Sequence, residues 1–215
     1  MVRILELEEY AKKHNIPIMM KDGIEFLLKY IKENNIKNIL EIGSAIGYSA
    51  IRMCLTDDDI KVTTIERDEN RYKEAVKNID EFKLSNRITI IYDDAFNVEL
   101  KDKYDLIFID AAKSQYIKFF EKFKSTLNSN GVIVSDNLDF HGLMKKNLNE
   151  IESRNVRGLV RKLNSYIDFL NNNNEFNTTF YNVGDGISIS KRCWNLFLSK
   201  KTKMYTSGLF KLNCY

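Results

Sequence analysis

The stretch Leu106-Ile-Phe-Ile-Asp-Ala-Ala-Lys113 decides the fold, because an unbroken apolar run is followed at once by charged side chains. The same form recurs at Val132-Ile-Val-Ser-Asp-Asn137. Short apolar runs of this kind are typical of strands that are buried on both faces of a parallel sheet. Such sheets bind ligands beyond the carboxyl ends of their strands. We therefore expect Asp110, Asp136 and Asn137 to lie together at that edge of the sheet.

These three side chains offer only oxygen atoms as ligands, from two carboxylates and one carboxamide. Hard divalent cations prefer oxygen, whereas zinc favours thiolate and imidazole. The set therefore predicts a site for Mg²⁺, or for Mn²⁺ or Ca²⁺ in its place. The cation that is used in the cell stays open.

Composition indicates a globular protein without an overall basic character. The chain has 215 residues, of which 44% are hydrophobic and 29% charged, enough to bury a core. The net charge of +3 comes from the end of the chain, where four lysines and no acid follow Arg192. Subtracting these four charges from +3 leaves −1 for residues 1–192. Nucleic-acid binding therefore needs a local basic patch.

Cysteine usage and hydropathy indicate a reducing compartment and no membrane segment. Three cysteines without close spacing favour neither a disulfide framework nor a zinc site. No apolar run reaches the length of a membrane span, and the first residues are acidic and amphipathic rather than signal-like. We expect a cytoplasmic protein with no membrane partner.

Apolar periodicity predicts an alternation of helices and strands. The expected helices are 5–14, 22–33, 48–55, 69–82, 116–127 and 157–171. The expected strands are 38–42, 61–65, 88–92, 104–109 and 131–135, followed by 175–182 and 187–191. Alternation indicates an α/β fold whose seven-stranded, mostly parallel sheet has helices on both faces. The turn residues Gly184-Asp185-Gly186 indicate that the last two strands form an antiparallel hairpin.

The domain organisation follows from the same pattern. We expect one domain over 1–192, which opens with helices in 1–35. The tail at 193–215 lacks a clear period, and its structure stays open.

A glycine-containing loop follows the first expected strand, at Glu41-Ile-Gly-Ser-Ala-Ile-Gly47. Glycines let the backbone approach a ligand closely, and the helix that begins at Tyr48-Ser49 presents free N–H groups. The spacing differs from the G-x-G-x-x-G of dinucleotide-binding loops. The carboxylate of Glu41 disfavours a phosphate and favours a cationic or amino-bearing ligand. The loop on its own is a weak signal.

Two further acids end the second and third expected strands. Glu66 stands where a carboxylate commonly accepts hydrogen bonds from ribose hydroxyls. Asp94-Ala95 is placed to meet an adenine edge. A ligand that combines adenine, ribose and an amino-acid group without phosphate is S-adenosylmethionine. Taken singly, each acid is more often a solvated or capping residue, so it is their order along successive strands that favours this donor.

These stretches resemble a known family, the divalent-cation-dependent class I S-adenosylmethionine O-methyltransferases, which include the catechol and caffeoyl-coenzyme A enzymes. The similarity covers about Leu7 to Arg192, and its most specific stretches are 38–43 with 48–49, 104–113, 135–137 and 184–191. Phe140-His141-Gly142 and Arg154-Asn-Val-Arg157 look most like the bacterial tRNA 5-hydroxyuridine methyltransferases. The resemblance implies a Rossmann-like methyltransferase fold, and homodimers are common in the family.

The resemblance also implies roles for individual residues. Asp110, Asp136 and Asn137 would bind the metal, and Asp110 and Lys113 would act in catalysis. The methyl donor would contact Glu41, Gly43, Tyr48, Ser49, Glu66, Asp94, Ala95 and Asp110. Two departures from the family are Met19-Met20-Lys21-Asp22, where relatives usually carry a proline-containing turn, and the tail after Arg192.

We hypothesise that the cation would hold two neighbouring oxygens of the acceptor and stabilise the oxyanion of one of them. The oxyanion would attack the sulfonium methyl group in line, and alignment would provide much of the rate. Lys113 would take the proton, for which the adjacent cation must favour its neutral form. The alternative is an ordinary surface lysine at a helix start. The chemistry suits 5-hydroxyuridine in a tRNA anticodon loop, and equally any catechol.

Basic residues after the metal-binding stretch suggest an RNA acceptor. The residues expected to contact RNA are His141, Arg154, Arg157 and Arg161, with Phe140, Lys145, Lys146 and Lys162 nearby. The three arginines share one face of the expected helix and would grip phosphates, while an aromatic ring stacks on an extruded base. A charged helix face is also commonly just solvated.

Three alternatives remain. The nearest is a small-molecule catechol or phenolic O-methyltransferase with the same site. A nicotinamide-dependent oxidoreductase is disfavoured by the glycine spacing and by the lack of an obvious hydride-transfer acid. A non-catalytic scaffold is disfavoured by the intact polar residues at 110, 113, 136 and 137.

Overall fold

The computed structural model describes residues 2–139, 142, 144 and 150–193. The strands are β1 (Asn38–Ile42), β2 (Lys61–Glu66), β3 (Ile88–Tyr92), β4 (Tyr104–Ile109), β5 (Leu127–Ser135), β6 (Phe176–Tyr181) and β7 (Ile187–Arg192). The helices are α1 (Val2–Lys13), α2 (Lys21–Glu33), α3 (Tyr48–Cys54), α4 (Glu69–Glu81), α5 (Tyr116–Phe123) and α6 (Arg154–Asn171), with two 3-10 turns, η1 (Lys113–Gln115) and η2 (Lys124–Thr126). Among the described helices, none has the length and apolar character needed to cross a bilayer.

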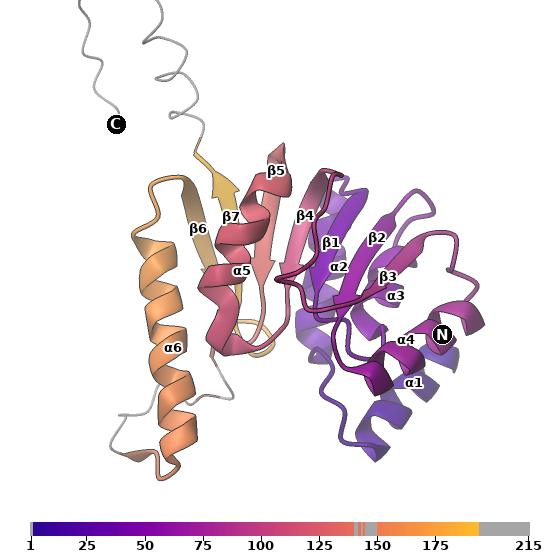
Figure 1. Ribbon diagram of the computed structural model, residues 1–215, viewed down its shortest axis with the longest axis horizontal. Coiled ribbons are helices and arrows are strands. Elements are labelled where there is room, and N and C mark those ends of the chain that lie inside the picture. Colours follow the sequence, from indigo (N-terminus) through magenta and orange to yellow (C-terminus); the bar gives the residue numbers. More distant parts are fainter. Residues whose placement is uncertain (1, 140–141, 143, 145–149, 194–215) are drawn as a thin grey trace, which may run out of the picture.

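The seven strands form one sheet in the order β3-β2-β1-β4-β5-β7-β6 (Figure 1). Strands β1 to β5 are parallel, and β7 runs antiparallel between β5 and β6. At the centre, Ile42 of β1 pairs with Ile109 of β4. Because neighbouring parallel strands end at the same edge, the residues that follow β1, β4 and β5 meet there. The predicted α/β class, mostly parallel sheet and C-terminal hairpin are confirmed.

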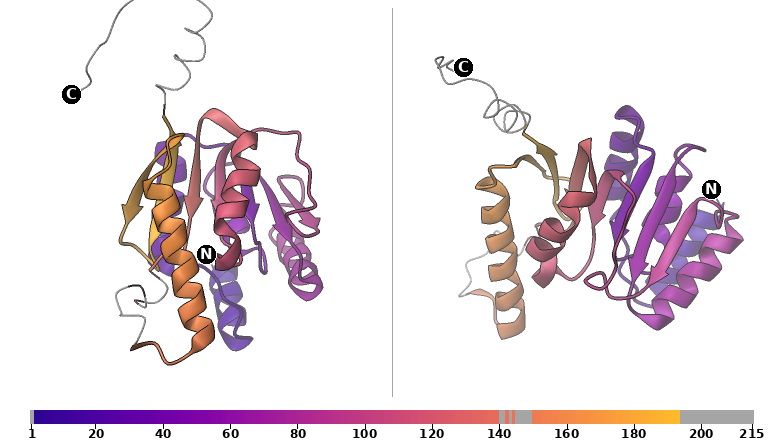
Figure 2. Two further views of the ribbon diagram at one scale, coloured as in Figure 1. Left: turned by 60° about the vertical axis from the view of Figure 1, so that its left-hand side comes forward. Right: turned by 45° about the horizontal axis from the view of Figure 1, so that its top comes forward.

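Alternate strand residues face opposite helix layers, as the two-residue period of a strand requires. Leu106 and Phe108 pack on the layer made by α1, α2, α3 and α4, whereas Ile107 and Ile109 pack on α5 and α6. The two groups of helices cover opposite faces of the sheet (Figure 2). All four side chains are fully buried. The continuous apolar run therefore serves two cores at once, one on each face of the sheet.

Several element boundaries differ from the prediction, and two of the larger shifts have identifiable causes. Helix α6 begins before the expected residue 157, because the Ser153 hydroxyl accepts a hydrogen bond from Val156 N–H and caps the helix. The expected helix 116–127 ends early, and its last residue, Leu127, instead pairs with Tyr104 as the start of β5. Leu127 is buried in the core under α5. Tertiary packing thus overrides the helical period.

The turn between β6 and β7 packs against the start of α2. The two carboxylate oxygens of Asp22 accept hydrogen bonds from Gly23 N–H and Gly184 N–H, both at 3.1 Å. A Cβ at Gly184 would lie 3.0 Å from Gly23 Cα, so the two glycines allow the backbones to touch. The N-terminal helices are therefore connected directly to the last hairpin of the sheet.

Candidate active site

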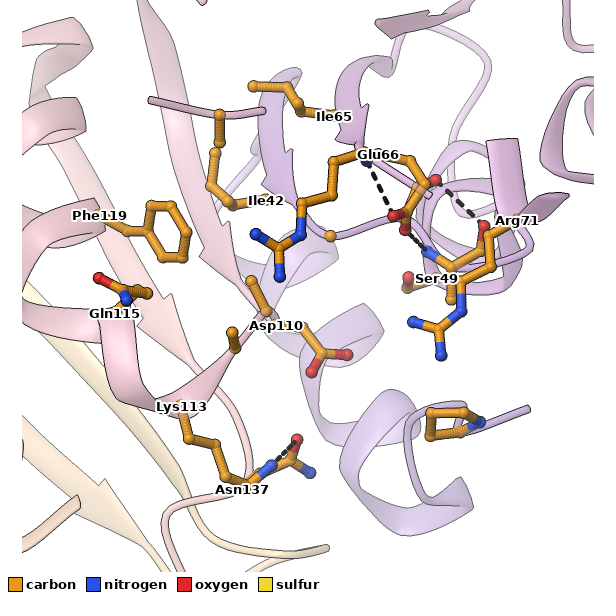
Figure 3. A pocket seen from close by; sticks show the side chains of 18 of the residues that line it. Ile42, Ser49, Ile65, Glu66, Arg71, Asp110, Lys113, Gln115, Phe119 and Asn137 are labelled. Carbon is orange, nitrogen blue, oxygen red and sulfur yellow. Dashed lines mark hydrogen bonds between the residues drawn. The ribbon is translucent and has the colours of Figure 1, made fainter. Parts of the chain in front are cut away.

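A cavity of about 680 Å³ opens at the edge of the sheet where the central strands end. Its lining comes from the loops after these strands, from α5 and from the segment between α1 and α2. The predicted site residues that line it are Gly43, Tyr48, Ser49, Glu66, Asp94, Ala95, Asp110, Lys113 and Asn137. Figure 3 shows Asp110 in the middle, with Phe119 and Gln115 on one side and Ser49 and Arg71 on the other.

Gly43 allows the loop after β1 to pack closely on β4. Its φ is +95°, and a Cβ there would lie 2.3 Å from the carbonyl oxygen of Asp110. The Gly43 N–H donates to the Ile65 carbonyl at 3.0 Å. The loop is therefore held between β2 and β4, and this brings Asp110 directly beside the glycine-containing stretch.

Glu66 is held rigidly at the end of β2. Its carboxylate accepts three backbone hydrogen bonds, each of 2.9 Å, from Ala45, Arg67 and Asp68. A carboxylate has about four lone-pair positions, so one stays available to a ligand hydroxyl. The geometry suits the ribose contact that the sequence predicts.

Aromatic side chains form the wall of the cavity next to α5. The rings of Phe96 and Phe119 stack with centroids 4.7 Å apart and an interplanar angle of 14°, and both line the cavity with Ala95. In the described part of the chain, the buried Gln115 Oε1 accepts no hydrogen bond. An apolar slot with an amide at its edge suits a purine ring. Sequence reasoning missed Phe119 and Gln115, because only the packing of α5 against the sheet brings them to the cavity.

Glu41 lies behind the cavity wall. Its side chain is fully buried and accepts hydrogen bonds from the hydroxyl groups of Ser49 and Thr64, the latter at 2.6 Å. Burial raises the pKa of Glu41 to about 7, although the two hydroxyl groups oppose this shift. Ser49 borders the cavity and Glu41 does not. The sequence predicted that Glu41 contacts the donor itself, whereas in the structure its carboxylate orients Ser49.

Tyr48 connects the cavity to the N-terminal helices. Its side chain borders the cavity, and its hydroxyl donates to the Glu8 carboxylate of α1 at 2.7 Å. The Arg52 guanidinium donates to the same hydroxyl at 2.8 Å and pairs with Glu25 of α2. Residues 17–20, between these helices, line the cavity. The segment that departs from the family in sequence is therefore part of the cavity wall.

Asp110, Asp136 and Asn137 meet beyond the ends of β4 and β5. Burial raises the pKa of Asp110 to about 6, and burial together with the Asp110 charge raises the pKa of Asp136 to about 7. Asn137 Nδ2 donates to Asp136 Oδ2 at 3.2 Å, but the buried Asp136 Oδ1 has no hydrogen-bond partner among the described residues. Two mutually repelling carboxylates with an unsatisfied oxygen fit a divalent cation.

The carboxamide belongs to this candidate metal site. Across residues 2–139 and the other described positions, no group of three or more His, Cys, Asp or Glu side chains is placed to hold a metal. A cation held by the two carboxylates would take its further ligands from other groups, and with Asn137 the set is oxygen-only and fits Mg²⁺ better than zinc. Asn137 has a φ of +60°, a conformation that is uncommon outside glycine and recurs at functional sites.

Lys113 lies in the site rather than on the open surface. Its Nζ donates to Asn137 Oδ1 at 3.0 Å (Figure 3). Its positive charge lowers the pKa of Asp110 and Asp136, against the larger effect of burial. The half-buried amine thus stands among the oxygen atoms that would hold the cation and the acceptor.

The β6–β7 turn supports the loop that follows β5. Leu138 N–H donates to the Gly186 carbonyl at 3.0 Å, and Asp139 N–H donates to the Asp185 carbonyl at 2.7 Å. Gly186 has a φ of +84°, and a Cβ there would lie 2.7 Å from the Asp139 nitrogen. Residues 184–186, which the sequence indicated only as a turn, are therefore part of the frame of the site.

The residues predicted to contact RNA have different environments. His141, with Phe140, Lys145 and Lys146, lies outside the described residues. Arg154 and Arg161 are exposed on α6. Arg157 instead donates to the carbonyl oxygens of Ile151 and Glu152, the latter at 2.9 Å, and so holds the turn before α6. Of the three predicted arginines, Arg154 and Arg161 are exposed and Arg157 is partly buried.

A mostly parallel sheet with an antiparallel β7 and a donor-sized cavity at its carboxyl edge defines the class I methyltransferase fold. A family model described as O-methyltransferase matches residues 2–193. A crystal structure of a "putative caffeoyl-CoA O-methyltransferase" from Staphylococcus aureus is 39% identical and covers 88% of this chain and 92% of its own, with a TM-score of 0.83. The chain therefore belongs to the S-adenosylmethionine-dependent O-methyltransferase family.

More distant relatives agree with this assignment. Tapetum-specific methyltransferase 1 of Arabidopsis thaliana is 26% identical over an alignment of 199 residues that covers 89% of this chain and 84% of the relative. The O-methyltransferase of Bacillus cereus, solved in complex with S-adenosylhomocysteine, is 22% identical, covers 90% of this chain and 91% of its own, and has a TM-score of 0.76. The latter likeness concerns the fold.

Proposed function

We propose that the protein transfers the methyl group of S-adenosylmethionine to a hydroxyl that adjoins a second oxygen, with a divalent cation bound by Asp110, Asp136 and Asn137. The observation that carries the proposal is the position of Lys113 Nζ, 3.0 Å from Asn137 Oδ1 and inside the donor cavity. A bound cation would supply Lewis-acid stabilisation of the acceptor oxyanion.

The cavity lining favours one orientation of the donor. The slot beside Phe119 suits the adenine, and the carboxylate of Glu66 suits the ribose. The amino-acid group then extends to the opposite side, toward Ser49 (Figure 3). The sulfonium methyl group would be presented toward Asp110 and Lys113, so the fixed lining supplies the alignment that methyl transfer requires.

A residue of this chain can take the proton that the methyl transfer releases. With the divalent cation bound nearby, Lys113 would hold a neutral amine, which would take the proton of the acceptor hydroxyl and become an ammonium. The acceptor oxygen forms a bond to the methyl carbon as the carbon–sulfur bond breaks, and the electron pair of that bond stays on sulfur. The product S-adenosylhomocysteine is a neutral thioether, so its sulfur no longer carries the charge of the donor.

For the acceptor, we infer 5-hydroxyuridine in a tRNA anticodon loop, which the reaction converts to 5-methoxyuridine. The exposed Arg154 and Arg161 support this choice, because α6 begins at the end of the molecule where β5 ends (Figure 1). A looped nucleotide is more easily splayed into a pocket than one in a duplex. The second candidate is a small catechol. Its two neighbouring oxygens would suit the candidate metal site equally well.

The test is mass analysis of tRNA nucleosides from cells that lack the protein. We expect loss of 5-methoxyuridine, restored by the wild-type chain and not by Lys113→Met. If every methoxyuridine persists, the RNA acceptor is wrong. Purified protein is then tested with labelled donor on a simple catechol: turnover that tRNA does not alter supports the small-molecule function.

A further inference from the structure

Arg71 extends from the first turn of α4 into the donor cavity. Figure 3 shows its guanidinium on the same side as Ser49 and across the cavity from Phe119. Among the described residues, its side chain forms no hydrogen bond, ion pair or ring contact, and only its backbone N–H is used, in the cap of α4 by Asp68. The other arginine of the lining, Arg67, is paired with Asp94 at 3.3 Å.

The Ser49 hydroxyl beside Arg71 is not available as a donor to an anion. Ser49 lies at the same side of the cavity, but its hydroxyl already donates to Glu41. The Ser49 oxygen is therefore left to accept a hydrogen bond, which suits an ammonium group. A carboxylate in the same place needs N–H or O–H donors, and the planar guanidinium of Arg71 offers a fork of them.

Electrostatics leads to the same conclusion. The amino-acid group of the donor would lie close to Asp110, whose negative charge attracts an ammonium and repels a carboxylate. A cation next to the donor carboxylate, on the side that faces away from Asp110, offsets this repulsion. Arg71 is the lining cation on that side of the view, across the cavity from Phe119 (Figure 3).

We propose that Arg71 binds the carboxylate of the donor's amino-acid group and thereby makes the site select donors and products that carry an intact amino acid. The inference rests on the proposed binding of S-adenosylmethionine and is independent of the acceptor. Arg67 is already paired with Asp94, in the part of the lining that we assign to the adenosine.

The experiment is calorimetric binding of two ligands to the purified full chain, without acceptor. S-adenosylhomocysteine carries the amino-acid group, whereas 5′-deoxy-5′-methylthioadenosine has the adenosine and the sulfur but no amino acid. We expect Arg71→Ala to weaken binding of the first ligand by roughly 10- to 100-fold, as for loss of a charge-assisted hydrogen bond, and binding of the second by less than about 2-fold. Arg71→Lys keeps the positive charge but lacks the planar fork of N–H donors. Its affinity for S-adenosylhomocysteine should therefore lie between those of the wild type and Arg71→Ala.

Two control variants make the result specific. Lys73→Ala removes an exposed cation of the same helix outside the cavity and leaves both affinities unchanged. Arg67→Ala weakens both ligands to a similar extent. Thermal melting verifies that each variant is folded.

Equal weakening of both ligands by Arg71→Ala would overturn the inference, because Arg71 would then act on adenosine or on the shape of the pocket. Unchanged affinity for both ligands would overturn it as well. If the wild-type chain binds neither ligand, the proposed donor fails too. If the protein binds S-adenosylhomocysteine normally but does not methylate tRNA, only the proposed acceptor is wrong.

Discussion

The Cα of Gly43 stands so close to Asp110 that a Cβ would lie 2.3 Å from the Asp110 carbonyl oxygen. Gly43→Ala therefore has both a clash and a strained φ of +95°, and we expect it to lower the free energy of unfolding by roughly 2–4 kcal/mol. Denaturant titration measures this. Gly158→Ala is the matched control: it lies in α6 with no atom within 4 Å of an added Cβ, and it should stabilise by about 0.5–1 kcal/mol.

Replacing Lys113 tests its role as the base. Lys113→Met should lower kcat by roughly 100-fold or more, as expected for loss of a general base, and leave S-adenosylhomocysteine affinity nearly unchanged. Lys113→Arg places a permanent positive charge next to Asn137 and cannot accept the proton, so kcat should be just as low. Steady-state kinetics decide the matter. Near-normal turnover by the arginine variant would show that only the charge matters.

Removal of divalent cations should abolish methyl transfer. After exhaustive chelation, we expect activity to return with Mg²⁺ and not with Zn²⁺, because the ligands are oxygen atoms. Donor binding, measured by calorimetry, should survive chelation. Asp136→Ala should stay inactive at cation concentrations that saturate the wild type. Full activity after chelation would contradict the proposed metal site.

Glu41 should make the protein less stable as pH rises. Its folded pKa of about 7 lies above the ordinary value of 4.5, so the folded state binds the proton more tightly than the unfolded state. The stabilisation that Glu41 contributes is therefore fully present below pH 4.5 and is lost as pH rises through about 7, a change of about 3 kcal/mol. In Glu41→Gln this contribution is missing. We expect the difference in unfolding free energy between the two proteins to change with pH over that window, and a constant difference would refute the assignment.

The arginines of α6 should matter only for an RNA acceptor. The double variant Arg154→Ala/Arg161→Ala should weaken tRNA binding and reduce its dependence on salt concentration, because fewer phosphate contacts release fewer counterions. Kinetics with a catechol should not change. A variant that removes two exposed lysines on the other face of the sheet, Lys29→Ala/Lys73→Ala, serves as the control. Equal tRNA affinity for the two double variants would count against the RNA assignment.

The strands and their edge could be predicted because their signal is local. Strand β4 and its neighbour β1 have the predicted bounds, since an apolar run between polar residues leaves little freedom in placing a buried strand. The position of Asp110 then follows from the end of β4. The position of Glu66 could be predicted for the same reason, because Glu66 ends β2 and its hydrogen-bond partners are backbone groups close to it in the structure.

The roles that depended on distant contacts could not be predicted. The sequence does not show that Ser49 and Thr64 would enclose Glu41, or that Arg157 would be used by carbonyl groups of the preceding turn. Arg71 belongs to an ordinary amphipathic helix pattern, and only the packing of α4 brings it to the cavity. In each case the deciding neighbour is set by tertiary structure rather than by spacing along the chain.

The support that residues 184–186 give to the loop after β5 has a consequence for biosynthesis. A ribosome delivers the chain from its N-terminus, so the donor-binding strands emerge long before Gly186 does. Until then, Leu138 and Asp139 lack the carbonyl groups that hold them. The loop after β5 therefore gains these two hydrogen bonds only once the last hairpin has been synthesised, well after the strands whose ends line the cavity.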